Sequence, residues 1–294
     1  MKRSPTGFVN RLRVGPTVLA ASAESRAAVA WPRRFGPFLC ARGGDLEVRV
    51  RREAIPPLGN LLFESEGVWR AYAQPEDRLL LTFRVGRRIY KAALLDPDRR
   101  RGEIYFPRAS RGSAAPRSAL QFPLDEMLFQ HRWAKDGLLE IHSCGVKDRG
   151  GVLLFTGHSG AGKSTLAKIW HAQAPSSPIL SDDRVLLDPR ALSGVRAFGT
   201  PWHGTGRFGS RSEGRLSALF FLEQAEATEA IRLHPAEAAA RLFTRSFPPI
   251  WDLEATERVV NACGDVAERV PAFLLRFRKD GSAIDAARRA AAVA

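Results

Sequence analysis

One loop in the sequence, Gly157 to Ser164, limits the fold more than any other feature. It reads GHSGAGKS and matches the pattern G-x-x-x-x-G-K-[ST] completely. The apolar run GGVLLFTG leads into the loop, and the segment KSTLAKIWHAQ, whose pattern is typical of a helix, continues from it. A strand that ends in a glycine-rich turn and continues as a helix presents backbone N–H groups to phosphate oxygens. The sequence therefore predicts an α/β domain that binds a nucleoside triphosphate.

The residues of this loop have distinct expected tasks. Lys163 is expected to reach the β- and γ-phosphates of ATP, and the Ser164 hydroxyl is expected to bind Mg²⁺. His158 occupies a variable position of the motif and is not expected to be catalytic. The same loop serves motors, switches, kinases and transporters, so it does not specify a reaction. The predicted nucleotide-binding residues are Gly157, Ser159, Gly160, Ala161, Gly162, Lys163, Ser164 and Thr165.

Two adjacent aspartates, Asp182 and Asp183, follow the loop in the segment SPILSDDRVLL, which is predicted as one strand. An acidic strand in this position completes a P-loop site, where a carboxylate holds the metal. The second carboxylate is then expected to take a proton from an acceptor hydroxyl. The alternative interpretation is a surface turn in which the pair caps the next segment. Arg184 is expected as a salt-bridge partner of the pair.

A single histidine, His142, lies in LLEIHSCGV, the strand expected beside the strand that precedes the glycine loop. A lone histidine in a strand is more often a hydrogen-bonded core residue than a catalyst. Its expected proximity to the nucleotide makes it a candidate catalytic residue here. Both interpretations stay open at this point.

The segment GTPWHGTG and the arginines after it are further candidates. Trp202 and His203 are predicted in a turn that either contacts the acceptor or only buries the tryptophan. An arginine such as Arg207 or Arg211 is able to close over the γ-phosphate as charge develops. In a chain this rich in arginine, each one taken singly is more often surface decoration.

The rest of the chain divides by pattern into three parts. Residues 1–35 are predicted as a basic leader, partly disordered, and residues 36–117 as a β-rich domain with a linker at 108–117. Residues 118–294 are predicted as the nucleotide-binding kinase domain, which begins with a helix in PLDEMLFQHRWAKDG. The strands expected before the linker are DLEVRVR, GVWRAYAQ, RLLLTFRV, RRIYKAALL and GEIYFP, and helices are expected over 235–247 and 251–268 and at the C-terminus.

The amino-acid composition limits the classes of partner and the compartment expected for this chain. The net charge of +14 comes almost entirely from arginine spread over all 294 residues, without a zinc-finger, recognition-helix or RNA-binding pattern, so a nucleic-acid partner is not favoured. The longest apolar runs are too short to span a membrane, and three widely separated cysteines argue against a disulfide framework. A reducing cytoplasm is the expected compartment. Apolar residues in the helices over 235–268 leave open a core role or a contact in a homo-oligomer.

The three motifs in order, HSCGV, GVLLFTGHSGAGKS and LSDDRV, resemble the catalytic domain of bacterial HPr serine kinase/phosphorylase. They are also similar to the ATP-dependent phosphoenolpyruvate carboxykinases, and the resemblance covers about residues 122–200. It implies an α/β P-loop kinase fold and the cofactors ATP and Mg²⁺. It also implies that Lys163 binds phosphate, Ser164 and Asp182 coordinate Mg²⁺, and Asp183 acts as base toward a serine hydroxyl. His142 would support the phosphate or the aspartate.

The sequence departs from the HPr kinases in two places. Thr165 stands where those enzymes usually have glutamate, and their glycine-rich downstream signature has no counterpart, since GTPWHGTG takes its place. In this the chain looks like the HPr-kinase-related proteins encoded beside bacterial peptide-modifying gene clusters. The expected function is therefore an ATP-dependent kinase acting on a serine of a peptide or small protein, rather than on HPr. The alternatives are a small-molecule phosphotransferase or carboxykinase-like enzyme, and a nucleotide-dependent binding module without transfer.

Overall fold

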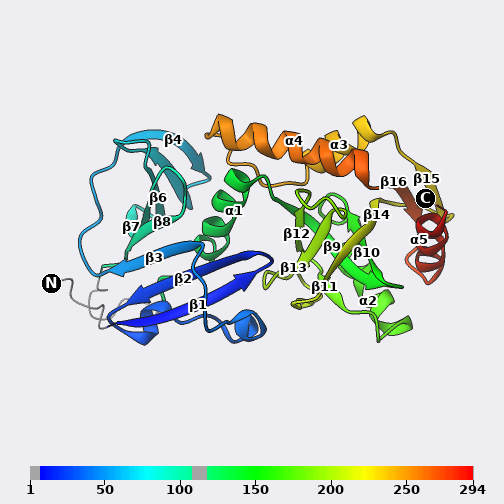
Figure 1. The fold of residues 1–294 in the computed structure, drawn as a ribbon, viewed down its shortest axis with the longest axis horizontal. Helices are drawn as coiled ribbons and strands as arrows, with labels where there is room; N and C mark the ends of the chain where they lie inside the picture. The colour runs from blue at the N-terminus through cyan, green and yellow to red at the C-terminus, as the bar shows by residue number, and fades with distance from the viewer. Residues whose placement is uncertain (1–6, 108–117, 294) are drawn as a thin grey trace. The chain divides into compact units, whose positions relative to one another are not determined.

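The computed structural model describes residues 7–107 and 118–293. The chain divides into two compact units, Met1–Arg132 and Trp133–Ala294, called unit 1 and unit 2 below. Each unit contains an eight-stranded sheet, so the protein is mixed α/β with more strand than helix (Figure 1). The predicted linker at 108–117 lies outside the described residues. Among the residues described, no helix is long and apolar enough to cross a membrane.

Unit 1 is built on a sheet with the strand order β1-β2-β3-β8-β7-β6-β5-β4. The strands β2, β3 and β8 run parallel, and the other neighbours are antiparallel. The five strands expected from the alternating apolar patterns are confirmed as β3 and β5–β8. The strands are β1 Phe8–Val14, β2 Thr17–Ala23, β3 Leu46–Arg51, β4 Asn60–Ser65, β5 Trp69–Ala73, β6 Leu79–Val85, β7 Arg88–Leu95 and β8 Arg101–Tyr105.

Part of the predicted leader, residues 8–23, contains two strands of the sheet in unit 1. Residues 1–6 are outside the described part, but β1 and β2 form an antiparallel pair that joins the sheet through β3. Leu12 and Leu19 on these strands are fully buried. Basic residues such as Arg11 alternate with these buried residues. They give the segment the composition of a leader, whereas the two-residue alternation is that of a half-buried strand.

The helix α1, Leu124–Asp136, confirms the helix predicted before the glycine loop. Leu124 and Leu128 are fully buried on it. The boundary between the two units falls inside this helix, after Arg132, rather than at the predicted position after residue 117. The first two turns of the helix therefore pack with unit 1.

A buried lysine, Lys91 on β7, holds the segment that precedes α1 in unit 1. Its Nζ donates hydrogen bonds to the carbonyl oxygens of Ala119 at 3.2 Å and Gln121 at 3.0 Å, and it lies 4.9 Å from the centre of the Phe83 ring. Burial lowers the pKa of Lys91 from 10.5 to about 8, although the charge of Asp125 opposes that shift. The charged form is thus retained at a cost in stability.

Removing this charge gives a stability difference that depends on pH. Below pH 8 Lys91 is protonated in both the folded and the unfolded chain, so the cost of burying the charge is fully present. Between about pH 8 and 10.5 the folded chain releases the proton first, so its stability rises with pH. At ~1.4 kcal/mol per pH unit, the native chain should gain about 3 kcal/mol over Lys91→Met across this window in urea denaturation. The exposed Lys279→Met serves as control, and a gap between native chain and Lys91→Met that does not change with pH would contradict the prediction.

Unit 2 is built on a second sheet with the order β10-β9-β12-β13-β14-β16-β15. The strands β10, β14 and β16 are parallel neighbours, while β9 and β10 form an antiparallel hairpin. Because parallel strands end at the same edge, the turns after β10, β14 and β16 meet there. The strands are β9 Leu139–Asp148, β10 Gly151–Thr156, β11 Ile179–Ser181, β12 Arg184–Asp188, β13 Arg196–Gly199, β14 Glu213–Gln224, β15 Glu229–Arg232 and β16 Ala272–Phe277.

Helices cover both faces of this sheet. The helices α3, Pro235–Phe243, and α4, Leu253–Arg269, pack on one face, where Leu242 and Val259 meet β9, β10 and β14 in one apolar cluster. The helices α2, Lys163–Gln173, and α5, Ser282–Ala292, pack on the other, in a cluster centred on Trp170. The predicted α/β layering is confirmed at this level (Figure 1).

Two predicted elements end differently in the structure. The predicted strand SPILSDDRVLL is interrupted, because the chain bends at Asp182 and Asp183 between β11 and β12. The buried Ser181 hydroxyl accepts the backbone N–H groups of Asp183 and Arg184, both at 3.1 Å, and so favours a turn over a continuous strand. The helix predicted over 235–247 stops at Phe243, where Thr244 takes the C-cap position and the Ser246 hydroxyl donates to the Phe243 carbonyl at 2.8 Å.

Candidate functional site

The glycine loop lies at the C-terminal end of β10, directly before α2. Gly160 and Gly162 have φ values of +82° and +110°, in the left-handed region that favours glycine. A Cβ on Gly162 would also lie 2.8 Å from the ring of Phe277. Gln224, at the end of β14, donates its side-chain N–H to the Gly160 carbonyl at 2.7 Å, so the neighbouring parallel strand fixes the loop. The loop has the backbone form that a phosphate cradle needs.

Lys163 lies buried at the start of α2, with its ammonium folded back over the loop. Its Nζ donates to the carbonyl oxygens of Gly157 at 2.9 Å and His158 at 3.2 Å. Burial lowers the pKa of Lys163; the charge of Asp183 opposes this, and the charges of Arg245 and Arg184 lower it further. The ammonium is therefore close enough to the acidic pair for their charges to interact.

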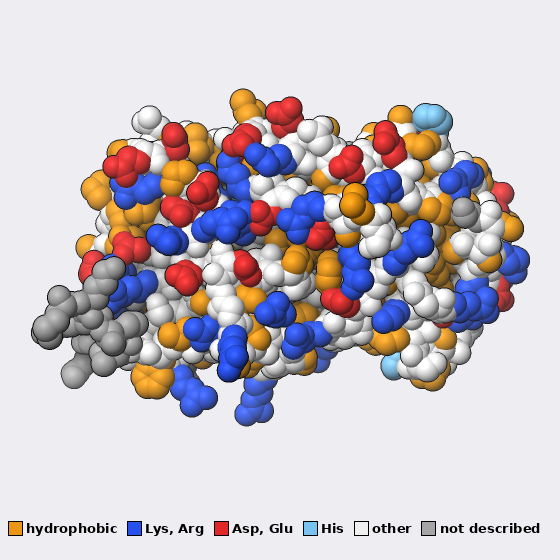
Figure 2. Space-filling view, in the orientation of Figure 1, with side chains coloured by type: hydrophobic (Ala, Val, Ile, Leu, Met, Phe, Trp, Pro, Cys, Tyr) orange, Lys and Arg blue, Asp and Glu red, His pale blue; other side chains and the backbone are white. Residues whose placement is uncertain are grey.

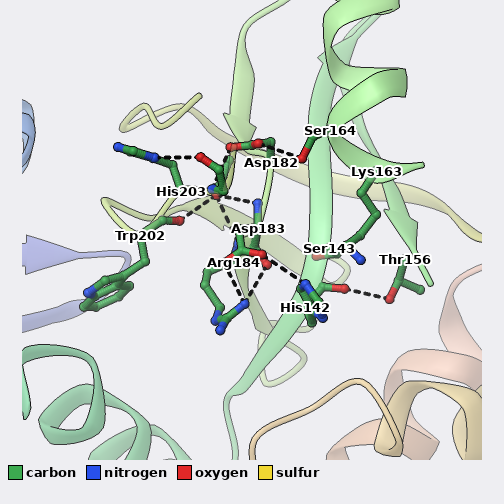
Figure 3. A network of polar contacts seen from close by, with 12 residues as sticks. His142, Ser143, Thr156, Lys163, Ser164, Asp182, Asp183, Arg184, Trp202 and His203 are labelled. Carbon is green, nitrogen blue, oxygen red and sulfur yellow. Dashed lines mark hydrogen bonds and ion pairs between the residues drawn. The ribbon is translucent and has the colours of Figure 1, made fainter. Parts of the chain in front are cut away.

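Asp183 lies in a network with His142 and Arg184 (Figure 3). Its Oδ1 is 3.0 Å from His142 Nε2, and its Oδ2 accepts Arg184 NH1 at 2.8 Å. Burial raises the pKa of Asp183, but the hydrogen bond from His142 and the charge of Arg184 outweigh it, so the net pKa lies below its usual value. The lowered pKa leaves the carboxylate ionised, and about 28% of the side chain is exposed.

The positions of His142 and Arg184 are themselves fixed. His142 pairs with Arg184 in the register of β9 and β12, and its carbonyl oxygen accepts the Thr156 hydroxyl at the end of β10, at 2.9 Å. The guanidinium carbon of Arg184 lies 4.3 Å from the centre of the Phe247 ring. His142 is therefore held against Asp183, with about 29% of its side chain exposed, rather than enclosed in the apolar core.

Asp182 is buried, and both of its carboxylate oxygens accept hydrogen bonds. Its Oδ2 accepts the Ser164 hydroxyl at 2.9 Å and the Gly206 N–H at 2.7 Å. Its Oδ1 accepts the N–H groups of Gly204 at 3.0 Å and Phe208 at 3.2 Å. A Cβ on Gly206 would lie 2.6 Å from Oδ2, so only glycine permits this approach. Asp182 thus joins the start of α2 to the loop of residues 204–208.

Ser164 and Asp182 fit a magnesium ion as oxygen ligands. The hydroxyl and the carboxylate meet beside the glycine loop, and hard oxygen donors are what Mg²⁺ prefers. Within the described residues there is no cluster of three or more His, Cys, Asp or Glu side chains suited to a metal. Mg²⁺ bound with a nucleotide generally uses one or two protein ligands together with phosphate oxygens and water, and one hydroxyl with one carboxylate is a ligand set of that kind.

The segment GTPWHGTG passes beside Asp182 and Asp183, and its residues differ in burial. Trp202 is buried and packs edge-on against Trp133, with ring centres 6.0 Å apart, and its carbonyl oxygen accepts the Ser181 hydroxyl at 2.8 Å. His203 is half-buried next to the loop that binds Asp182, while Arg207 and Arg211 are exposed. Of the two interpretations of this turn, the buried tryptophan describes Trp202.

No protein-family model matches this chain, and no curated protein has a similar sequence. The assignment of the site therefore rests on its residues and their geometry.

One charged residue near the site, Arg245, was not selected from the sequence. It lies in the connection after α3, where its carbonyl oxygen accepts the backbone N–H of His142 at 2.8 Å. The next residue, Ser246, forms an isolated bridge with Ile141 on β9. The charge of Arg245 lowers the pKa of Lys163, so the guanidinium is near enough to repel the Lys163 ammonium. The sequence pattern placed it inside a helix, and it belongs to no motif.

Replacing Arg245 with methionine tests this position. For the phosphoryl transfer proposed below, a guanidinium near Lys163 would suit the charge that develops on the transferring group, so Arg245→Met should lower kcat by about a hundredfold. The loss of its positive charge should also raise the pKa of Lys163. Steady-state kinetics checks the first effect. Arg241→Met is the matched control, because Arg241 pairs with Glu237 on exposed α3; equal losses in both variants would remove Arg245 from the site.

Proposed function

We propose that this chain is an ATP- and Mg²⁺-dependent kinase that transfers the γ-phosphate to a serine hydroxyl of a peptide or small protein. The observation that carries the proposal is the ionised Asp183, held by His142 and Arg184 and in electrostatic contact with Lys163 at the glycine loop. A switch or motor needs a phosphate cradle and a metal ligand. A second, partly exposed carboxylate beside them suits an acceptor that loses a proton.

The residues divide the reaction among them. The loop N–H groups and Lys163 would hold the phosphates, and Ser164 and Asp182 would hold Mg²⁺, which would supply positive charge for the transfer. Asp183 orients the serine hydroxyl and accepts its proton as the oxygen bonds to the γ-phosphorus and ADP leaves. Because the pKa of Asp183 is lowered, its carboxylate is ionised and able to accept this proton.

The proposal includes the fold of unit 2. A histidine on the strand before the loop, the loop itself and the acidic pair after it occur in the same order as in the HPr kinases and ATP-dependent phosphoenolpyruvate carboxykinases. The helices on both faces of a mixed sheet, and the loop at the end of a central strand, are compatible with a P-loop kinase domain of that type.

Direct transfer of labelled phosphate tests the proposed function. Purified chain with γ-labelled ATP, Mg²⁺ and serine-containing peptides encoded near its gene should label one peptide, and the matching peptide with alanine for serine should stay unlabelled. Chelation of Mg²⁺ should stop the labelling. Nucleotide binding without label on any peptide would support a binding module instead, and label on small alcohols or acids alone would support a small-molecule phosphotransferase.

A further inference from the structure

One face of the sheet in unit 1 collects arginine side chains from separate strands. Arg11 on β1 pairs with Ala20 on β2, Ala20 with Glu47 on β3, and Glu47 with Arg101 on β8. Paired residues on neighbouring strands point to the same face of a sheet. The next row in the same register adds Val9, Ser22, Arg49 and Glu103. The opposite face is the buried one.

This face contains a hollow of about 650 Å³. Small side chains on β2, Ala20 and Ser22, lie between the longer side chains of β1 and β3 and so lower its floor. Apolar residues such as Leu94 contribute to the lining. A hollow of this size accommodates a short peptide segment rather than a single ion. The charged lining residues are Arg11, Arg49, Arg51, Arg78 and Arg101, with Glu47, Asp96 and Glu103.

The acidic residues of the hollow are largely engaged. Glu103 accepts Arg51 Nε at 2.9 Å and the Tyr105 hydroxyl at 2.7 Å. Asp96 Oδ1 accepts the backbone N–H groups of Arg100 at 2.8 Å and Arg101 at 3.1 Å. The hollow therefore has few acidic groups left to neutralise its remaining arginines.

The remaining arginines are available for a partner. Arg49 and Arg101 are exposed, and the half-buried Arg11 donates its Nε to the Gly43 carbonyl at 3.0 Å. Arg51 forms the ion pair with Glu103, and the charge of Arg49 also helps to lower the pKa of that carboxyl. Exposed guanidiniums on adjacent strands present forked donors that suit carboxylates. Figure 2 shows basic and acidic side chains mixed over the visible surface of the molecule, so net charge alone does not mark a binding face. The strand register instead places Arg11, Arg49 and Arg101 on one face of the sheet.

We propose that this arginine face of unit 1 docks an acidic segment of the peptide or protein that the kinase phosphorylates. The inference rests on the proposed kinase function, which makes that peptide or protein the substrate. The occupant is an extended stretch rich in Asp and Glu, whose carboxylates meet Arg49 and Arg101 and whose aliphatic parts lie over Ala20 and Leu94. Charge complementarity selects this occupant. Unit 1 does not contain the glycine loop, so docking there would hold the substrate through residues other than the acceptor serine.

Binding of a defined probe tests the proposal without chemistry. The full chain is titrated against a fluorescein-labelled ten-residue peptide of alternating Asp, Glu and small residues, with anisotropy as the signal at low salt. We expect saturable binding with Kd of about 10 to 100 µM, weakened by added salt. The double variant Arg49→Glu/Arg101→Glu should weaken it at least about tenfold, and the neutral Arg49→Gln/Arg101→Gln, which adds no repulsion inside unit 1, by about threefold or more.

A matched variant separates the face from overall charge. Arg87→Glu/Arg88→Glu changes net charge equally at the exposed turn between β6 and β7, and should bind as the native chain does. Equal loss in this control, equal binding of a peptide with Asn and Gln for Asp and Glu, or tighter binding of a single-stranded oligonucleotide would each overturn the proposal. Asp183→Asn should bind the probe normally, because docking needs no transfer; loss there would place the peptide at the glycine loop and also overturn it.

Discussion

Asp183→Asn is expected to lower kcat for phosphoryl transfer by about a thousandfold, while MgATP still binds. Asparagine has the size of aspartate, and its carbonyl oxygen can still accept from Arg184. Its amide N–H can donate to His142 when Nε2 of that ring is unprotonated, so the pairing of β9 with β12 should persist. Its amide cannot accept the hydroxyl proton, and this proton is lost only during the chemical step. Single-turnover kinetics together with an ATP-binding titration measures the two effects separately.

The same substitution at Asp188 provides the control. Asp188 ends β12 and pairs with Arg190 at 2.8 Å, without contact to the glycine loop. Its replacement by asparagine should leave kcat within about twofold. If Asp183→Asn instead loses ATP affinity as strongly as kcat, Asp183 holds the metal, and the roles of the two aspartates are exchanged.

Lys163→Met is expected to have the other large effect, lowering kcat/KM by at least about a thousandfold and weakening ATP binding. The ammonium is poised by the carbonyl oxygens of Gly157 and His158, at the point where phosphate charge would lie. Methionine fills a similar volume without charge. Because burial lowers the pKa of Lys163, the charged form is not favoured by the fold, and the variant should remain folded.

Lys168 provides the matched control for this prediction, since it is an exposed lysine on the same helix. Lys168→Met should keep both kcat and ATP affinity. A Lys163→Met chain that is folded by circular dichroism and still transfers phosphate would remove the lysine from the site and, with it, the main support for phosphate binding by the loop.

The elements that sequence analysis located well are those with a strong local signal. The glycine loop, β10 and α2 follow from an apolar run, left-handed glycines and a helical pattern, all contained within a few residues. β3 and β5–β8 follow from alternation. The hairpin of β9 and β10 then brings His142 to the loop because the turn between the two strands is short.

The features that sequence analysis missed depend on contacts between distant segments. Arg245 reaches the site because its connection pairs with β9, which no pattern near residue 245 indicates. The hydrogen bonds of Asp182 to Gly204 and Gly206 join segments whose separation in the chain hides their proximity. β1 has the basic composition of a leader, and only Leu12 and Val14 of its residues are buried, so its pattern did not indicate a strand.

The bend between β11 and β12 makes two neighbouring carboxylates unequal. In a continuous strand, consecutive side chains would point to opposite faces, and one of the two would leave the site. With the bend, Asp182 is enclosed by amide donors and Asp183 remains partly open. The difference between the two aspartates is therefore encoded in backbone geometry, through the hydroxyl of Ser181, and two chemically identical residues acquire different surroundings from one turn.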